Sequence, residues 1–209
     1  MTPALTELLD APQWLALAAA LGWASGIRLY AAVFMVGLAG YMGWLELPPG
    51  LAVLEHPAML GVSASMLLME FVADKIPFID TMWDTAHTLI RIPAGAVLAA
   101  GALGADSGVI SAIAALMGGS LAAASHATKM TTRAAVNASP EPFSNIAVSL
   151  FEDGLVIAAL WLAANHPVLF GFALVITLML MVWLMVVLFS FLKALLKRLG
   201  NWFGGAGAA

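Results

Sequence analysis

Six apolar runs, separated by helix breakers, follow one another along this chain and constrain its fold more than any other feature. A helix needs about 20 mostly apolar residues to cross a bilayer, and glycine, proline and asparagine mark nearly every join between the runs. The sequence therefore predicts an all-α polytopic membrane protein with six transmembrane helices in a single integral membrane domain, followed by a flexible tail over residues 200–209. The predicted spans cover residues 13–43, 57–73, 80–104, 108–134, 143–165 and 168–195.

The charge content supports a protein whose solvent is lipid. Charged residues make up 10% of the 209 residues, whereas a soluble domain has about 25%. A net charge of −4 gives no basic footprint for nucleic acid, and the lack of cysteine excludes disulfides and thiolate metal sites. The first residues, MTPALTELLDAPQW, lack the basic start of a signal peptide, so we expect them to be retained. No cofactor is indicated.

The basic residues predict the orientation. In the six-helix arrangement, the first, third and fifth connections hold no Lys or Arg. Basic residues concentrate on the cytoplasmic side of membrane proteins, so we expect both termini in the cytoplasm and the protein in the plasma (inner) membrane of a bacterium. The residues that this topology places on the cytoplasmic side are Lys75, Lys129, Arg133, Lys193, Lys197 and Arg198.

A polar stripe runs along the third predicted helix. Asp80, Asp84, His87 and Arg91 fall within about 60° of one another at helical spacing. Arg91 lies about 16 Å along the helix axis, near mid-membrane, where a charge usually faces a partner or a water-filled cavity. Asp80 could instead simply cap the helix, and Arg91 could form a buried ion pair that only orients helices.

A second stripe, of Asn145, Ser149 and Glu152, repeats part of this spacing on the fifth predicted helix. Both stripes follow a Pro-Phe pair, which indicates an internal repeat relating helices two and three to helices four and five. An inverted three-plus-three arrangement remains the alternative. We predict that the two stripes face each other across a cytoplasm-facing polar cavity, with Arg91 at its floor near Glu152.

Arg28 adds a charge near the centre of the first apolar run. An unpaired charge at this depth is costly, and Glu152 or Asp153, at a similar depth, is its predicted partner. The small residues at positions 22, 25 and 26 let helices approach closely and also permit a break in the helix.

Further ionisable residues lie toward the predicted cytoplasmic face. Glu70 is expected to pair with Arg91, Lys129 or Arg133. Lys129 and Arg133 share a helical face with His126. These basic residues either orient the chain and reach lipid headgroups or form a vestibule that attracts anions.

Two segments carry a resemblance to a known family. ADKIPFIDTMWDTAHTLIRIPAG and HATKMTTRAAVNASPEPFSNIAVSLFEDG resemble the domain of unknown function 4126 family, small multi-pass membrane proteins mainly from bacteria. One departure is the extra residue between Arg91 and Pro93. The resemblance extends from about residue 15 over nearly the whole chain, and it implies a polytopic membrane protein and no substrate. The family pattern falls on Ala73, Asp74, Lys75, Pro77, Asp80, Trp83, Asp84, Arg91, Pro93 to Gly95, His126, Lys129, Arg133, Ser139, Asn145, Glu152 and Asp153.

Three functions are compatible with these residues. The first is a transporter or channel for a small solute or ion, because buried arginines beside carboxylates suit an anionic substrate or proton coupling, and a histidine such as His87 is a common proton carrier. The residues predicted to line its pathway are Arg28, Glu70, Asp80, Asp84, His87, Arg91, Lys129, Arg133, Asn145, Ser149, Glu152 and Asp153.

The second function is a non-catalytic membrane scaffold or assembly protein, in which the stripes serve only as interhelical hydrogen bonds. The third is an enzyme acting on a lipid headgroup or polyprenyl phosphate, with a metal held by Asp80, Asp84, His87 and Glu152. No nucleophile motif supports it, and hard cations want more oxygen ligands. A solvated cavity at Arg91 would favour transport or catalysis, and dry packing would favour a scaffold. A homo-oligomer is compatible with all three.

Overall fold

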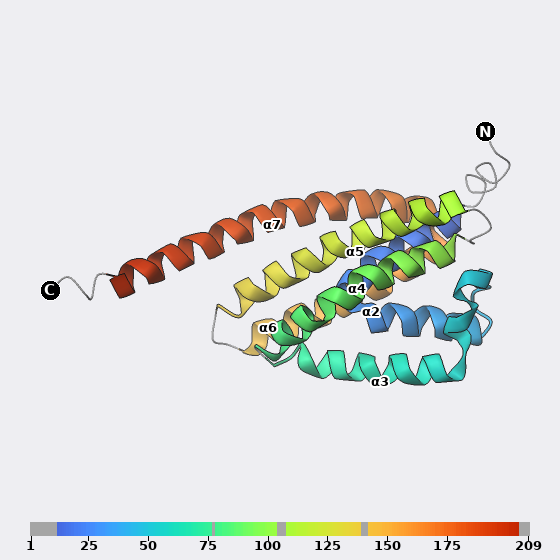
Figure 1. The fold of residues 1–209 in the computed structure, drawn as a ribbon, viewed down its shortest axis with the longest axis horizontal. Coiled ribbons are helices and arrows are strands. Elements are labelled where there is room, and N and C mark those ends of the chain that lie inside the picture. Colours follow the sequence, from blue (N-terminus) through green and yellow to red (C-terminus); the bar gives the residue numbers. More distant parts are fainter. Residues whose placement is uncertain (1–11, 77, 104–107, 139–141, 205–209) are drawn as a thin grey trace.

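The computed structural model describes residues 12–76, 78–103, 108–138 and 142–204, and this part of the chain is helical without strands (Figure 1). The six long α-helices coincide with the six predicted ranges to within a few residues, except that the last is longer. The elements are α2 (Pro12–Tyr41), the 3₁₀ helix η1 (Pro49–Glu55), α3 (Pro57–Ala73), α4 (Ile79–Ala102), α5 (Gly108–Val136), α6 (Pro142–Asn165) and α7 (Pro167–Gly204).

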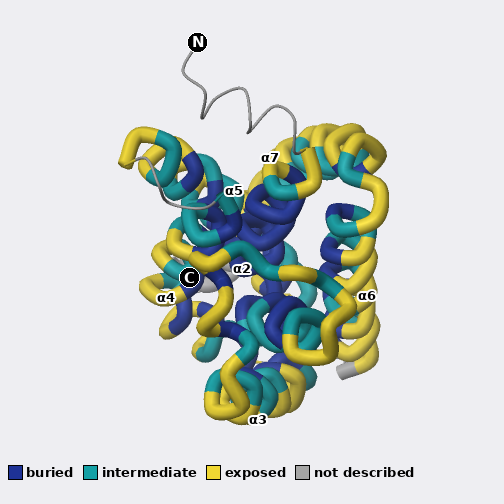
Figure 2. The backbone as a smooth tube through the Cα atoms, turned by 90° about the vertical axis from the view of Figure 1, so that its right-hand side faces the viewer, coloured by how far each residue is buried: buried dark blue, intermediate teal, exposed yellow. Residues whose placement is uncertain are grey.

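Several of these helices have the length and composition of membrane spans. Among the described residues, α2, α5, α6 and α7 qualify, and η1 with α3 adds a fifth candidate as a pair bent by 70°. Helix α4, which carries the predicted polar stripe, is not among them. In the most apolar stretch of 18 residues in α7, only 6% of the residues are buried within the protein, as expected of a helix that faces lipid. Figure 2 shows the buried residues gathered around α2 and the exposed ones on the outer helices.

Helix α2 is not one continuous rod, because the chain folds back at Arg28 (φ −142°, ψ 73°). Before Arg28 the chain runs antiparallel to α4, and after Arg28 it runs parallel to α4, so the two halves form a hairpin (Figure 1). Contacts with α4 follow the antiparallel order as far as Tyr30: Gly95 lies by Gly22, Arg91 by Gly26 and His87 by Tyr30. Val33, further along the second half, instead lines a pocket with Leu98, nearer the C-terminal end of α4.

This hairpin changes the predicted topology. Its halves, residues 12–27 and 29–41, are about 24 and 20 Å long, shorter than a hydrocarbon core of about 30 Å. The expectation that residues 13–43 cross as one helix is therefore not confirmed, and the break that the small residues at positions 22, 25 and 26 permit is present at Arg28. A hairpin of this kind is tolerated at membrane depth because protein surrounds it; 78% of the apolar window of α2 is buried. The count of six crossings is not confirmed.

Small residues let α2, α4 and α5 pack against one another closely. A Cβ atom built on Gly22 would lie 2.6 Å from the Cα atom of Gly118. Each helix contributes two small residues four positions apart, the spacing that aligns them on one helix face. The seam consists of Gly22 and Gly26 on α2, Gly95 and Ala99 on α4, and Gly118 and Ala122 on α5.

Two further predictions concern the tail and the repeat. Helix α7 continues to Gly204, so the predicted flexible tail from residue 200 is wrong up to that point, and residues 205–209 lie outside the described residues. The internal repeat is not confirmed. Phe78 precedes α4 with a positive φ of 68°, whereas Phe143 lies within α6, so the two Pro-Phe pairs are used differently. Pro77 lies outside the described residues.

Candidate functional site

Arg28 stands at the tip of the α2 hairpin, surrounded by acidic groups. Its guanidinium lies 3.0 Å from Asp153 and 3.8 Å from Glu152, which confirms the predicted pairing. Its closest carboxylate, however, is Asp74 at 2.7 Å. Ser149 adds a hydroxyl that accepts a hydrogen bond from Arg28 at 2.7 Å.

Asp74, in the turn between α3 and α4, is the centre of the charged cluster. Its Oδ2 atom also lies 2.9 Å from Lys129 and 3.5 Å from Arg133, and its side chain is fully buried. Burial alone would raise the pKa of Asp74, but Lys129, Arg28 and Arg133 together hold this pKa below its ordinary value. In the sequence, Asp74 stands out only as part of the family pattern, although its position one helical turn after Glu70 could have placed it on the same face.

Arg91, the deepest residue of the α4 stripe, is fully buried and doubly paired. It contacts Glu70 of α3 and lies 2.8 Å from Asp84 on its own helix. Asp84 also pairs with Lys129 at 3.1 Å, so the α4 stripe and the Asp74 cluster form one network. The expected proximity of Arg91 to Glu152 is not observed as a contact.

The other two members of the α4 stripe have their closest side-chain hydrogen bonds with uncharged partners. His87 lies 3.1 Å from the Tyr30 hydroxyl and stacks on Trp83 with ring centres 4.2 Å apart. Asp80 accepts hydrogen bonds from the Asn137 amide at 3.0 and 3.1 Å. Tyr30, Trp83 and Asn137 were not predicted as site residues, but Asn137 lies one turn beyond Arg133 and could have been included in the α5 face.

The two predicted stripes point into the same interior but do not face each other directly. Arg133 of α5 stands between them, with Glu152 at 2.7 Å and Asp80 at 4.0 Å. Arg133 also donates to the backbone carbonyl of Asn145 at 3.3 Å. The predicted arrangement of opposing walls is therefore wrong in its detail, because α5 inserts its cations between α4 and α6.

The broken helix exposes backbone carbonyls to these cations. At a helix end the last carbonyls lose their intrahelical donors and carry the negative end of the helix dipole. Lys129 donates to the carbonyl of Ile27 at 3.1 Å, and Arg91 to that of Gly26 at 3.4 Å. His126 also contacts the Gly26 carbonyl at 3.3 Å. The hairpin tip thus contributes negative charge at backbone atoms and positive charge at Arg28.

The four candidate metal ligands do not converge. His87 faces Tyr30, Asp84 faces Arg91 and Lys129, and Glu152 faces Arg133. Within the described ranges, no group of three or more acidic or histidine side chains is placed to hold a metal ion. The metal-dependent enzyme therefore loses its predicted ligand set.

The network is closed except at its margins. Asp153 has the most exposed carboxylate of the network, at 23% of its side chain, against 9% for Glu152 and about zero for the others. Asp153 thus marks the rim of the network. Lys75, a half-buried residue near Asp153, donates a hydrogen bond to the Ser149 hydroxyl at 3.4 Å. Burial lowers the pKa of Lys75, while Asp153 opposes the shift.

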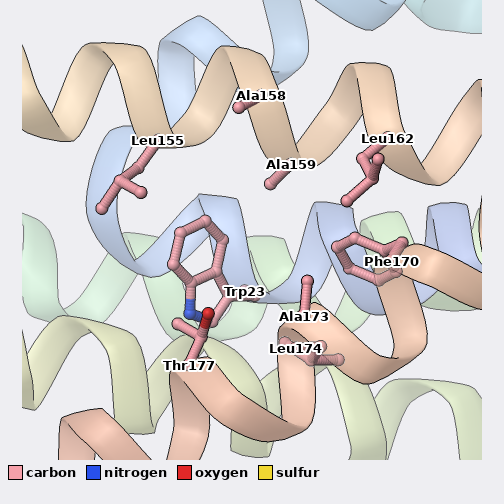
Figure 3. A pocket seen from close by; sticks show the side chains of 9 residues that line it. All are labelled: Trp23, Leu155, Ala158, Ala159, Leu162, Phe170, Ala173, Leu174 and Thr177. Carbon is pink, nitrogen blue, oxygen red and sulfur yellow. The ribbon is translucent and has the colours of Figure 1, made fainter.

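A groove between α5, α6 and α7 reaches the network from the side. It has a volume of about 310 Å³, and Lys129 and Glu152 form part of its wall. Trp23 and Thr177 line both this groove and a neighbouring apolar pocket of about 130 Å³ (Figure 3). The polar network and the apolar α7 surface therefore meet at the groove.

These features define the class: a helical membrane protein in which a hairpin-shaped broken helix carries an arginine into a buried network of ion pairs. The chain belongs to the family described as "Domain of unknown function (DUF4126)", whose profile matches residues 15–187. No curated protein and no solved structure matches the chain.

Proposed function

We propose that the protein is a membrane transporter or channel for a small solute or ion, and that the charge network at the hairpin tip is its substrate pathway. The single observation that carries this proposal is the break at Arg28, which places a cation, and backbone carbonyls that accept from Lys129 and Arg91, among buried charges. Irregular backbone at membrane depth occurs where it is buried in protein or lines a cavity, and broken helices form the ion and substrate sites of many transporters.

The chemistry of the network also suits proton binding. Four buried cations pair with six carboxylates, so the network carries excess negative charge when every carboxylate is ionised. Such an excess is costly away from water. Three buried carboxylate oxygens, Glu70 Oε2, Asp74 Oδ1 and Asp84 Oδ2, have no hydrogen-bond donor within the described part of the chain. A proton on any of them would relieve the excess.

The orientation we propose keeps the network toward the cytoplasm. Lys75 and Asp153 mark its most accessible edge. The C-terminal part of α7, whose sequence contains Lys193 and Lys197, extends beyond the end of the bundle at which α3 ends and α4 begins (Figure 1). Basic residues favour the cytoplasmic side. Helix α2 starts at the opposite end, so this orientation places the C-terminal end of α7 in the cytoplasm of a plasma membrane and the start of α2 outside. It differs from the six-span topology expected from the sequence, in which both termini are cytoplasmic.

A scaffold is the second candidate, and the burial of Arg91 favours it. Arg91 is fully buried and its ion pairs link α3 with α4, as expected of a residue that only orients helices. A transporter requires in addition that these pairs exchange partners.

Flux through liposomes distinguishes the two candidates. The purified protein is reconstituted and screened for movement of metal ions, small anions and protons. A transporter gives a flux that falls when Asp84→Asn weakens the network and that is retained in Glu46→Gln, a matched carboxyl-to-amide change at an exposed loop position. Absence of any flux from correctly folded protein would contradict the proposal and favour the scaffold.

A further inference from the structure

Two carboxylate oxygens in the network face the same three cations. Asp74 Oδ2 and Glu152 Oε2 are each within 4 Å of one nitrogen from each of Arg28, Lys129 and Arg133. The distances to Asp74 are 2.7, 2.9 and 3.5 Å, and those to Glu152 are 3.8, 3.8 and 2.7 Å, in that order of cations. Three cations around one oxygen atom constitute an anion site that a side chain of the protein occupies.

The two carboxylates differ in their freedom to leave this site. Asp74 is fully buried in the turn between α3 and α4. Glu152 has a side chain that is 9% exposed and lies at the wall of the α5–α6–α7 groove. Thr128, Thr132 and Thr177 also line that groove, and their hydroxyls can hydrogen-bond a neutral carboxyl group. When Glu152 is protonated, its side chain can therefore turn away from the cations and into the groove.

We propose that Arg28, Lys129 and Arg133 bind a small monovalent anion, a halide or a short carboxylate, and that Glu152 occupies the site until a proton neutralises it. The proton adds to a Glu152 carboxylate oxygen, the neutral side chain turns into the groove, and the anion takes its place. One positive charge and one negative charge enter together, so the net charge of the buried network does not change. This inference rests on the proposed transport function and gives it a substrate class.

The electrostatic surroundings of Glu152 are consistent with this exchange. The hairpin tip, α5 and the α3–α4 turn present charged groups to it, whereas the described residues of α7 that line the groove are uncharged. Asp80 and Asp84 of α4 pair with cations that also contact Glu152: Asp80 with Arg133 and Asp84 with Lys129. The groups in direct reach are Arg28, Lys129, Arg133 and, of like charge, Asp74 and the adjacent Asp153.

Anion binding to the purified protein in detergent tests the site without requiring transport. Binding to the native state raises Tm by an amount that grows with the logarithm of ligand concentration over Kd, so Tm is titrated with sodium chloride or sodium formate at constant ionic strength. Gluconate, too large for the site, serves as the balancing anion. We expect chloride, formate or both to bind the wild type more tightly at about pH 5 than at about pH 8, by up to about tenfold for each unit by which the pH is lowered, because one proton must bind first. The two salts distinguish a halide site from a carboxylate site.

Substitutions separate this exchange from general salt effects. In Glu152→Gln the amide cannot ionise, so the anion should bind with similar affinity at both pH values, within about twofold. Glu46→Gln should behave as the wild type, and Arg133→Gln should lose binding at both. An affinity in the wild type that is independent of pH, or a pH dependence retained in Glu152→Gln, would overturn the inference.

The liposome assay keeps this inference distinct from the transport proposal. Flux of some solute without chloride or formate binding would leave the transporter in place and refute the anion site. Binding without flux would support the anion site and refute transport.

Discussion

The three central helices, α2, α4 and α5, are held together in two different ways along their length. In the seam of small residues, the helix backbones are in close contact, and a Cβ atom added to a seam glycine would collide with the neighbouring helix. In the charge network, the same helices meet each other and the α3–α4 turn through charged side chains, and those at its centre have several partners: Asp74 pairs with three cations, and Lys129 with three carboxylates. The seam therefore fixes the helices in one arrangement. In the network, by contrast, a cation such as Lys129 can pair with any of several carboxylates.

This difference indicates where the molecule can move. Without a hydrophobic driving force between helices, close packing of small residues supplies much of the association in a membrane. Buried ion pairs add little net stability, because desolvation offsets attraction, but removal of one partner is costly. The seam is therefore suited to be the fixed part of a transporter, and the network to be the part that exchanges partners. The predictions below test this contrast.

Loss of the network's centre should have the largest effect. Asp74→Asn removes the closest carboxylate of both Arg28 and Lys129, and the loss of one partner from these buried ion pairs should lower the free energy of unfolding in detergent by about 3–5 kcal/mol. Asp153→Asn, at the rim of the network, should cost much less.

A double-mutant cycle sharpens this prediction. Because Asp74 and Arg28 pair directly, Asp74→Asn combined with Arg28→Gln should cost less than the sum of the two single losses. Simple additivity would show that the two groups act independently, against the proposed network.

A substitution in the seam should come next in size. A Cβ atom on Gly118 would collide with the Gly95 carbonyl and the Ala99 side chain, so Gly118→Ala should destabilise by about 1–3 kcal/mol. On Gly119 the nearest contact would be Ala96 at 3.4 Å. Gly119→Ala should therefore be neutral or stabilising by up to about 1 kcal/mol, the ordinary preference of a helix for alanine. Equal effects in thermal unfolding would argue against the tight seam.

A neutral hydrogen bond beside the network should contribute less. Tyr30→Phe removes the hydroxyl that lies 3.1 Å from His87 and should cost about 0.5–1.5 kcal/mol. Tyr41→Phe, at a side chain that is 58% exposed, is the matched control and should leave stability unchanged. If both variants unfold alike, the His87 contact makes no measurable contribution.

Acid should affect the network only at the low end of the pH range. The pKa of Asp74 is lower in the folded protein than in the unfolded chain, so its contribution is fully present above the unfolded value of about 3.9. This contribution is lost as pH falls through the lower, folded pKa. Unfolding free energies measured through this acidic window should fall less steeply in Asp74→Asn than in the wild type. Identical slopes would show that Asp74 does not contribute to the acid sensitivity.

Much of the fold was predictable because hydrophobic length and helix breakers are local signals. They located all six long helices, and the cost of a buried charge was enough to predict that Arg28 pairs with Asp153 and Glu152. The stripe spacing likewise brought Asp84 and Arg91 to the interior.

The hairpin and the centre of the network were not predictable to the same degree. Residues 13–43 read as one long apolar run, and a reversal at the single residue Arg28 leaves the hydropathy unchanged. Small residues nearby indicated only that a break was permitted. Asp74 lies in a short turn outside any apolar run, and its central place depends on how α3, α5 and the hairpin tip meet, which spacing along one helix cannot show.

The reversal of α2 at Arg28 is tested most directly by finding on which side of the membrane each end of α2 lies. The chain has no cysteine, so single cysteines at Gln13 and Tyr41, both exposed, can be labelled in intact cells with a membrane-impermeant maleimide, beside a cysteine at Lys193. A hairpin that returns at Arg28 predicts that Gln13 and Tyr41 share one accessibility and that Lys193 has the opposite one. Labelling of Gln13 and Tyr41 from opposite sides would mean that residues 12–41 cross the membrane, and would contradict the hairpin that carries Arg28 into the charge network.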